Sequence, residues 1–186
     1  MLGLMQDQPL LVSSLIEFAA RHHADAEIVS RRVEGDLHRY TYAQAAARSR
    51  QVARALDRLG LGFSDRVGTL AWNGYRHFEL YFGVSGSGRV VHTINPRLAP
   101  DQVAWIANHA EDQVLCFDMT FLPIIKAIWK QCPTVKHWIA LCDADALPVD
   151  TGIAGLQSYE AWIGSEPTDY DWPEFDEKSA CALCYT

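Results

Sequence analysis

Apolar positions in the first sixty residues follow a helical period twice. Leu15 and Phe18 begin the first series after Ser14, which with Glu17 has the spacing of a capping box. Thr41 begins a second, longer series, with a glutamine three residues on as its capping partner. Gly60 ends that series, as glycine often does at a helix C-terminus. Two short β-prone runs, 28–30 and 37–40, lie between these helices around a glycine turn and predict a hairpin.

Short apolar runs then alternate with helical segments. The runs that predict strands are 67–71, 90–94, 114–117, 137–141 and 181–185, and the segments that predict helices are 75–83, 100–109 and 121–130. Continuous apolar strands separated by helices are typical of a parallel sheet that is covered on both faces. We therefore expect the α/β class, with a mostly parallel sheet flanked by helices.

Residues 142–178 differ in composition from the rest of the chain. They are rich in Asp, Glu, Gly and Pro, with one short helical patch at 159–163. We expect this segment to run over the surface before the chain re-enters the sheet at Cys181.

Composition and charge exclude several classes of function. The 186 residues are 49% hydrophobic and carry a formal net charge of −7, with Arg31-Arg32 as the only adjacent basic pair. Nucleic-acid binding therefore has no electrostatic support. The start of the chain is apolar but lacks a preceding basic region, and no apolar segment approaches the roughly 18 residues that span a bilayer. We expect a cytoplasmic protein without a signal peptide or a transmembrane segment.

The cysteines and acidic pairs give weak site signals. Five cysteines are scattered through apolar stretches, which favours reduced, buried thiols over disulfides, and the Cys181-x-x-Cys184 pair lacks a second pair at metal-binding spacing. The acidic pairs 143/145 and 169/171 lack the ordered spacing of a calcium loop, so we interpret them as solvated charge.

Two further patterns concern ligand binding directly. Gly83, Gly86 and Gly88 follow a helix and are not in the order of a nucleotide loop, which indicates a helix end and a turn. The segment 92–98 reads His-Thr-Ile-Asn-Pro-Arg-Leu and places Arg97 where a strand ends, at the edge at which open α/β folds bind ligands. A salt bridge of Arg97 within a tight turn is the alternative.

Six blocks in order along the chain resemble the AMP-forming acyl-CoA synthetase family, whose members form acyl-adenylates. The blocks are 40–44, 65–67, 71–73, 92–98, 108–112 and the closing Tyr185-Thr186. The block 92–98 is most similar to the medium- and long-chain fatty-acid–CoA ligase branch. The resemblance identifies residues 1–186 as the N-terminal portion of the AMP-binding domain, ending at the entry to the phosphate loop.

The resemblance implies a ligase that uses ATP, Mg²⁺ and CoA to activate a fatty acid through an acyl-adenylate. It carries over one site residue, Thr186, whose hydroxyl would approach the phosphates or Mg²⁺, and no catalytic residue. We therefore expect these 186 residues to be inactive alone. The expected partners are a fatty acid and no nucleic acid, with peripheral membrane contact and a homodimer left open. A stand-alone binding or dimerisation module derived from the family is the alternative.

Overall fold

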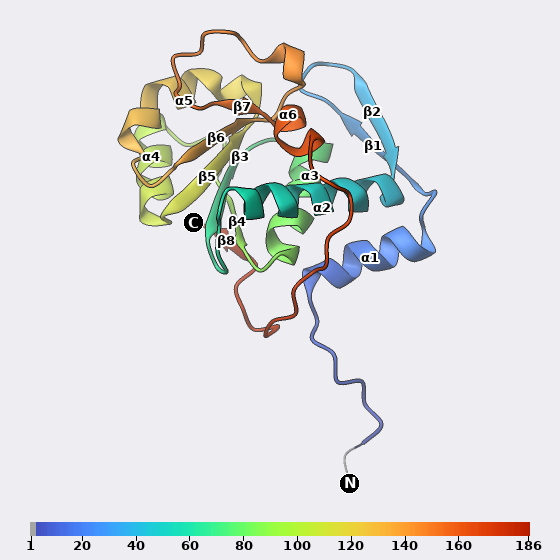
Figure 1. The fold of residues 1–186 in the computed structure, drawn as a ribbon. Coiled ribbons are helices and arrows are strands. Elements are labelled where there is room, and N and C mark those ends of the chain that lie inside the picture. The colour runs from blue at the N-terminus through green and yellow to red at the C-terminus, as the bar shows by residue number, and fades with distance from the viewer. Residues whose placement is uncertain (1–2) are drawn as a thin grey trace.

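A parallel six-stranded sheet between two layers of helices forms the body of the protein (Figure 1). The computed structural model describes residues 3–186. The sheet order is β7-β6-β5-β3-β4-β8, and every neighbouring pair is parallel. The strands are β3 (Arg66–Leu70), β4 (Val90–Thr93), β5 (Asp112–Phe117), β6 (His137–Ala140), β7 (Gln157–Ser158) and β8 (Ala182–Cys184). The expected α/β class and all five expected strands are confirmed.

Two helical layers cover the sheet because side chains alternate between its faces. Val67, Val91 and Val114 face one layer, and Leu115 and Phe117 face the other. The first layer holds α2 (Tyr42–Arg58), α3 (Tyr75–Gly86) and α6 (Tyr159–Gly164), and the second holds α4 (Pro100–His109) and α5 (Leu122–Ile128). Short 3₁₀ turns, Met119–Phe121, Trp129–Gln131 and Ala144–Ala146, complete the helical segments.

The N-terminal part packs outside the first layer. Helix α1 (Val12–His22) contacts α2 and α3, and β1 (Glu27–Arg31) pairs antiparallel with β2 (Leu37–Thr41), as the hairpin prediction required. The capping box of Thr41 and Gln44 is confirmed at the start of α2. The capping box predicted at Ser14 is wrong. Because α1 begins at Val12, Ser14 lies inside its first turn, where its hydroxyl donates to the Leu11 carbonyl at 2.7 Å.

Glycines let α2 and α3 approach each other closely. A Cβ placed on Gly83 would lie 2.5 Å from the Val52 Cβ and 2.8 Å from the Ser49 carbonyl oxygen. Gly83 and Gly86 belong to α3, which runs three residues beyond the predicted end, and Gly88 forms the following turn with φ +79°. Gly83 and Gly86 are therefore packing residues inside the helix, and only Gly88 lies in the turn that the sequence indicated.

The expectation that residues 142–178 lie wholly on the surface is wrong for their central part. Gln157–Ser158 form β7 beside β6, and Tyr159, Trp162 and Ile163 of α6 are completely or almost completely buried. A two-residue strand is too short to show a period, so the acidic and proline-rich surroundings concealed it.

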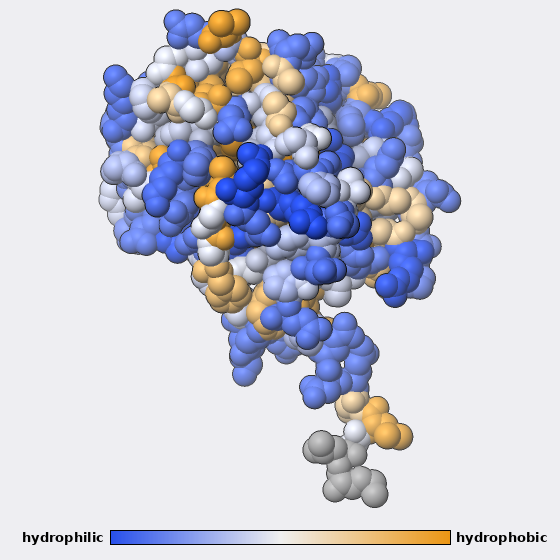
Figure 2. Space-filling model, viewed as in Figure 1, coloured by the Kyte–Doolittle hydropathy of each residue, from blue (hydrophilic) through white to orange (hydrophobic). Residues whose placement is uncertain are grey.

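Arginines of the first layer are paired with carboxylates. Arg76 donates to Glu160 at 2.9 Å and to Glu34 at 2.8 Å, and also binds Asp143. Arg48 contacts Glu79 at 2.7 Å and Glu160 at 3.0 Å. We call these two arginines and their four carboxylates the arginine cluster. Figure 2 shows that the outer face over α2 is mostly hydrophilic, and the arginines that follow on α2 contact carboxylates as well.

Two predictions about the cysteines and the acidic pairs need correction. Cys116, Cys132 and Cys142 are buried free thiols, but Cys181 and Cys184 are exposed because β8 pairs only with β4 among the described strands. Asp143 is a member of the arginine cluster and is not a free solvated charge. The other three aspartates, 145, 169 and 171, are exposed as expected, with Asp169 3.3 Å from Arg54. Within residues 3–186, no helix combines the length and the apolar character needed to cross a membrane.

Candidate functional site

Polar residues gather at one edge of the sheet, because all six strands are parallel and their carboxyl ends coincide. Asn95 follows β4, Asp118 follows β5, and Thr186 follows β8. Ligands bind at this edge in open α/β folds. A functional site is therefore expected along it.

Thr186 lies at a hollow of about 700 Å³ between the end of β8 and α4. The hollow is lined by Asn95, Leu98, Asp101, Gln102, Trp105, Ile106, Tyr185 and Thr186. The structure thus brings Thr186 and the segment 92–98, two sequence-predicted candidates, to the same place. Apolar and polar groups meet here, which suits a ligand with both kinds of surface.

Arg97 is exposed next to this hollow. Its backbone N–H donates to the Asn95 side chain at 3.0 Å, which closes a tight turn after β4. The salt bridges among residues 3–186 do not include Arg97, so the alternative of a structural ion pair finds no partner there. Its guanidinium remains available for an anion.

Tyr185 contacts His109, which the sequence did not single out as a site residue, and His92 of the segment 92–98. Its hydroxyl lies 2.6 Å from Nδ1 of His109, which sits in the last turn of α4. The ring of Tyr185 also covers His92, at 5.2 Å between centroids. These contacts join positions far apart in the chain, so local patterns carry no sign of them.

The turn after β3 forms a second polar group at the same edge. Asp118 is buried and accepts the backbone N–H of Trp72 at 2.6 Å. Burial raises the pKa of Asp118 to about 6, although the bond from Trp72 opposes the shift. His77 places Nδ1 3.1 Å from the Trp72 carbonyl and Nε2 3.0 Å from the Thr69 hydroxyl. Burial lowers the pKa of His77, which favours a neutral imidazole that braces this turn.

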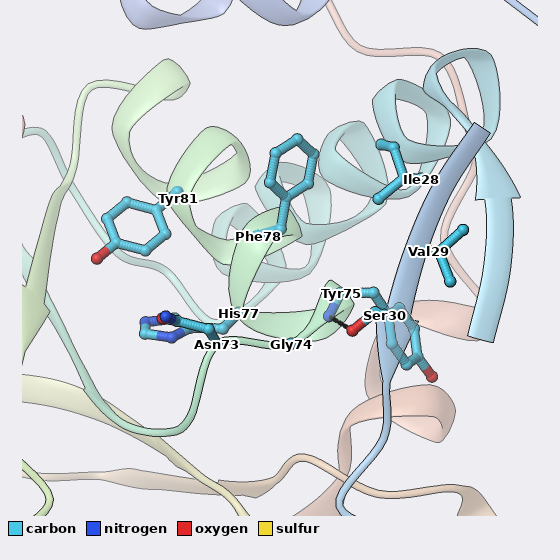
Figure 3. Close-up of a pocket in the computed structure, with 9 residues that line it drawn as sticks. All are labelled: Ile28, Val29, Ser30, Asn73, Gly74, Tyr75, His77, Phe78 and Tyr81. Atoms are coloured by element: carbon cyan, nitrogen blue, oxygen red, sulfur yellow. Dashed lines mark hydrogen bonds between the residues drawn. The ribbon is translucent and has the colours of Figure 1, made fainter. Parts of the chain in front are cut away.

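A smaller hollow of about 290 Å³ lies between β1 and the N-terminal half of α3 (Figure 3). Figure 3 shows Phe78 and Tyr81 on α3 and Ile28 on β1 around it, with the Ser30 hydroxyl accepting the Tyr75 N–H at 3.0 Å. Its imidazole, His77, is already bonded to Thr69 and Trp72. The groups around this hollow therefore suit packing better than chemistry.

Metal binding has little support among the protein's own side chains. Residues 3–186 contain no group of three or more His, Cys, Asp or Glu side chains placed to hold a metal ion. Cys181 and Cys184 are exposed free thiols on either end of β8. A single hydroxyl, that of Thr186, fits the coordination of a Mg²⁺ that arrives bound to a nucleotide and keeps several waters.

Comparison with known proteins places this geometry in a family. The model of the AMP-binding enzymes matches residues 16–186. The chain belongs to the family of AMP-binding enzymes. It is 50% identical to a 3-methylmercaptopropionyl-CoA ligase of Ruegeria lacuscaerulensis, an alignment that covers 100% of the chain and 34% of that protein. It is 44% identical to a medium-chain-fatty-acid–CoA ligase of Ectopseudomonas oleovorans, again over 100% of the chain and 34% of the relative.

Solved structures agree with this assignment of the fold. The anthranilate CoA ligase AuaEII, in complex with anthranoyl-AMP, matches with a TM-score of 0.82 at 23% identity, over 97% of this chain and 32% of that one. A fatty acyl CoA synthetase of Mycobacterium tuberculosis matches with a TM-score of 0.75 at 26% identity, over 95% and 32%. The chain thus spans about a third of the length of the AMP-binding enzymes that it matches.

Proposed function

We propose that this chain is the N-terminal portion of the AMP-binding domain of a fatty-acid–CoA ligase. The single observation that supports this most is that Thr186 and the segment 92–98, through Asn95 and Leu98, meet at one hollow on the carboxyl edge of the sheet, in a chain of the AMP-binding family. The fatty acid carboxylate would attack the α-phosphate of ATP, releasing pyrophosphate, and the thiol of CoA would then displace AMP. A cytoplasmic location is part of the same proposal.

The residues present fit part of a nucleotide site. The Thr186 hydroxyl would contact a phosphate oxygen or Mg²⁺, and the Arg97 guanidinium would offset phosphate charge. Tight phosphate binding needs several converging backbone N–H groups and cations. Residues 1–186 alone should therefore bind Mg-ATP more weakly than micromolar and should not turn over. Calorimetry of residues 1–186 with Mg-ATP tests this, and micromolar binding would contradict it.

The substrate test uses the complete gene product. We expect pyrophosphate release with saturated acids from hexanoic to octadecanoic acid, and acyl-CoA formation when CoA is added. Release with an amino acid or a luciferin, and with no fatty acid, would assign the protein to a different activity.

A second candidate substrate is a short thioether acid. The 50% identity to a protein named 3-methylmercaptopropionyl-CoA ligase favours it. The same assay should include 3-methylmercaptopropionate beside butyrate and octanoate. A kcat/KM at least about tenfold higher for the thioether acid, equal to about 1.4 kcal/mol of transition-state binding, would select this candidate over the fatty acids.

A binding or dimerisation module without chemistry remains the alternative to a ligase. Sedimentation of residues 1–186 separates the two hypotheses in combination with the assay. A stable dimer together with an inactive complete gene product would favour the module. Activity in the complete gene product would favour the ligase, whatever the oligomeric state.

A further inference from the structure

The short strand β8 is weakly held, although the candidate site residue Thr186 follows only two residues after its end. It pairs only with β4 among the described strands, through the registers Val91↔Ala182, His92↔Leu183 and Thr93↔Cys184. An edge strand of three residues has few backbone hydrogen bonds to hold its end in place. The position of Thr186 must therefore depend on side-chain contacts near the end of the strand.

Tyr185 supplies those contacts on the α4 side of the sheet. Its hydroxyl is 2.6 Å from Nδ1 of His109. The His109 ring stacks on Trp105, with centroids 4.7 Å apart and planes at 17°. The rings of Trp105 and Tyr185 are perpendicular, with centroids 6.3 Å apart, although 59% of the Trp105 surface is exposed. An exposed tryptophan that is ordered by stacking supports the imidazole which binds Tyr185.

A buried pair lies beneath the Tyr185 ring. His92 Nδ1 is 2.8 Å from the Asp112 carboxylate, and both residues are 0% exposed. The pair fits only because Gly68 lies beside it, where a Cβ would be 2.6 Å from the Asp112 Oδ2. The Nε2 of His92 has no partner among residues 3–186. The Tyr185 ring thus packs over the buried pair of His92 and Asp112, and its hydroxyl is hydrogen-bonded to His109 of α4.

We propose that Tyr185 and His109 are a positioning pair that sets the place of Thr186 for nucleotide binding. Thr186 is the next residue along the backbone, so a displacement of the Tyr185 backbone also displaces Thr186. A hydroxyl bonds to a phosphate oxygen only within about 2.5–3.0 Å, and a displacement of about 1 Å is costly in an active site. This inference rests on the proposed nucleotide role of Thr186.

The test uses variants of the complete gene product and three readouts. Tyr185→Phe and His109→Leu each remove the hydrogen bond, and their double variant completes a cycle. His109→Asn keeps a side-chain nitrogen or oxygen near the place of Nδ1. His22→Leu is the matched control, since His22 is also an exposed histidine in the last turn of a helix. The readouts are Mg-ATP affinity by calorimetry, hydrogen exchange of residues 182–186 without nucleotide, and the KM for CoA.

We expect Tyr185→Phe and His109→Leu each to weaken Mg-ATP binding by about threefold to tenfold, the range for loss of one hydrogen bond. The double variant should be no weaker than either single one, because both remove the same bond. His109→Asn and His22→Leu should stay within about twofold of wild type. Exchange in 182–186 should be faster in the first two variants, and the KM for CoA should not change.

Three results would overturn the inference. The first is wild-type Mg-ATP affinity in both single variants, the second is additive losses in the double variant, and the third is equal losses for ATP and CoA. Each would show that Tyr185 and His109 do not position Thr186. A complete gene product that does not bind Mg-ATP at all would instead refute the proposed function together with the inference. That outcome is distinguishable because it appears in the wild-type protein.

Discussion

Charged side chains are paired and mostly buried in the arginine cluster, whereas the edge formed by β4 and β8 leaves a charged side chain exposed. In the cluster, Arg76 is 5% exposed and contacts three carboxylates, while Glu79 is 0% exposed against Arg48. At the edge, Arg97 and Thr186 are exposed beside an open hollow. Charges that neutralise one another inside the protein hold α2, α3, α6 and the hairpin together. Charges left exposed at the edge can bind a ligand.

The two carboxylates at the centre of the cluster, Glu79 and Glu160, have pKa values shifted in opposite directions. Burial raises the pKa of Glu79, and the attraction of Arg48 only partly offsets it. The pKa of Glu160 is lowered, because Arg48 and Arg76 together outweigh the effect of burial. A carboxylate with two arginines is held as an anion, whereas one with a single arginine in a fully buried place is not held as firmly.

The largest expected effect comes from breaking the cluster at Arg76. Arg76→Met removes the charged hydrogen bonds to three partly buried carboxylates at once and should lower the free energy of unfolding by about 3 kcal/mol or more. Urea denaturation measures this. Arg97→Met is the matched control at the edge and should change stability by no more than about 0.5 kcal/mol. Equal losses of unfolding free energy from the two substitutions would show that the cluster stabilises the fold no more than the edge does.

The next effect concerns a carboxylate that is buried without a cation. The pKa of Asp118 is raised from 3.8 to about 6, so the folded state favours the neutral acid. This contribution to stability is complete below the unfolded pKa and is lost as the pH rises through the folded pKa. We expect a loss of about 2–3 kcal/mol across that window, at about 1.4 kcal/mol per pKa unit.

Asp118→Asn tests that pH dependence. The amide oxygen can still accept the Trp72 N–H, but the side chain no longer titrates. The difference in unfolding free energy between wild type and variant, followed through the window, isolates Asp118 from other carboxylates. A difference that stays constant with pH would show that Asp118 has an ordinary pKa.

A smaller effect tests the close packing of α2 against α3 in the first helical layer. Gly83→Ala places a Cβ against Val52 and the Ser49 carbonyl, and overpacking of this kind costs about 1–3 kcal/mol. Gly164→Ala is the control, since a Cβ there meets nothing within 4 Å. Thermal unfolding of the two variants side by side gives the measurement. A Gly83 variant as stable as wild type would mean that α2 and α3 separate at little cost.

The smallest expected effect on the fold, and a clear one on activity, is at the edge. Thr186→Val keeps the shape of the side chain and removes the hydroxyl, so stability should not change. If the hydroxyl contacts a phosphate or Mg²⁺, the adenylation rate of the complete gene product should fall by about tenfold. Rates within twofold of wild type, with unchanged Mg²⁺ dependence, would show that the Thr186 hydroxyl has no role in adenylation.

Much of the architecture was predictable because its signals are local. The alternation of apolar runs and helices predicted the α/β class, and the capping box of Thr41 predicted the start of α2. The block 92–98 indicated the carboxyl edge through its residue types and its place after a strand. Local signals failed where an element was too short, as at β7, or where a hydroxyl had two possible bonds, as at Ser14.

The sequence by itself determined the class of fold, the family and the one candidate residue, Thr186. Only the tertiary structure decided what surrounds that residue. Tyr185 reaches His109 and His92 reaches Asp112 across gaps of 76 and 20 residues, and Arg76 meets Glu34, Asp143 and Glu160 from three separate elements. Periodicity records which face of an element is buried, and it contains nothing about which distant side chain will lie opposite. That depends on sheet order and helix packing, which arise only when the whole chain folds.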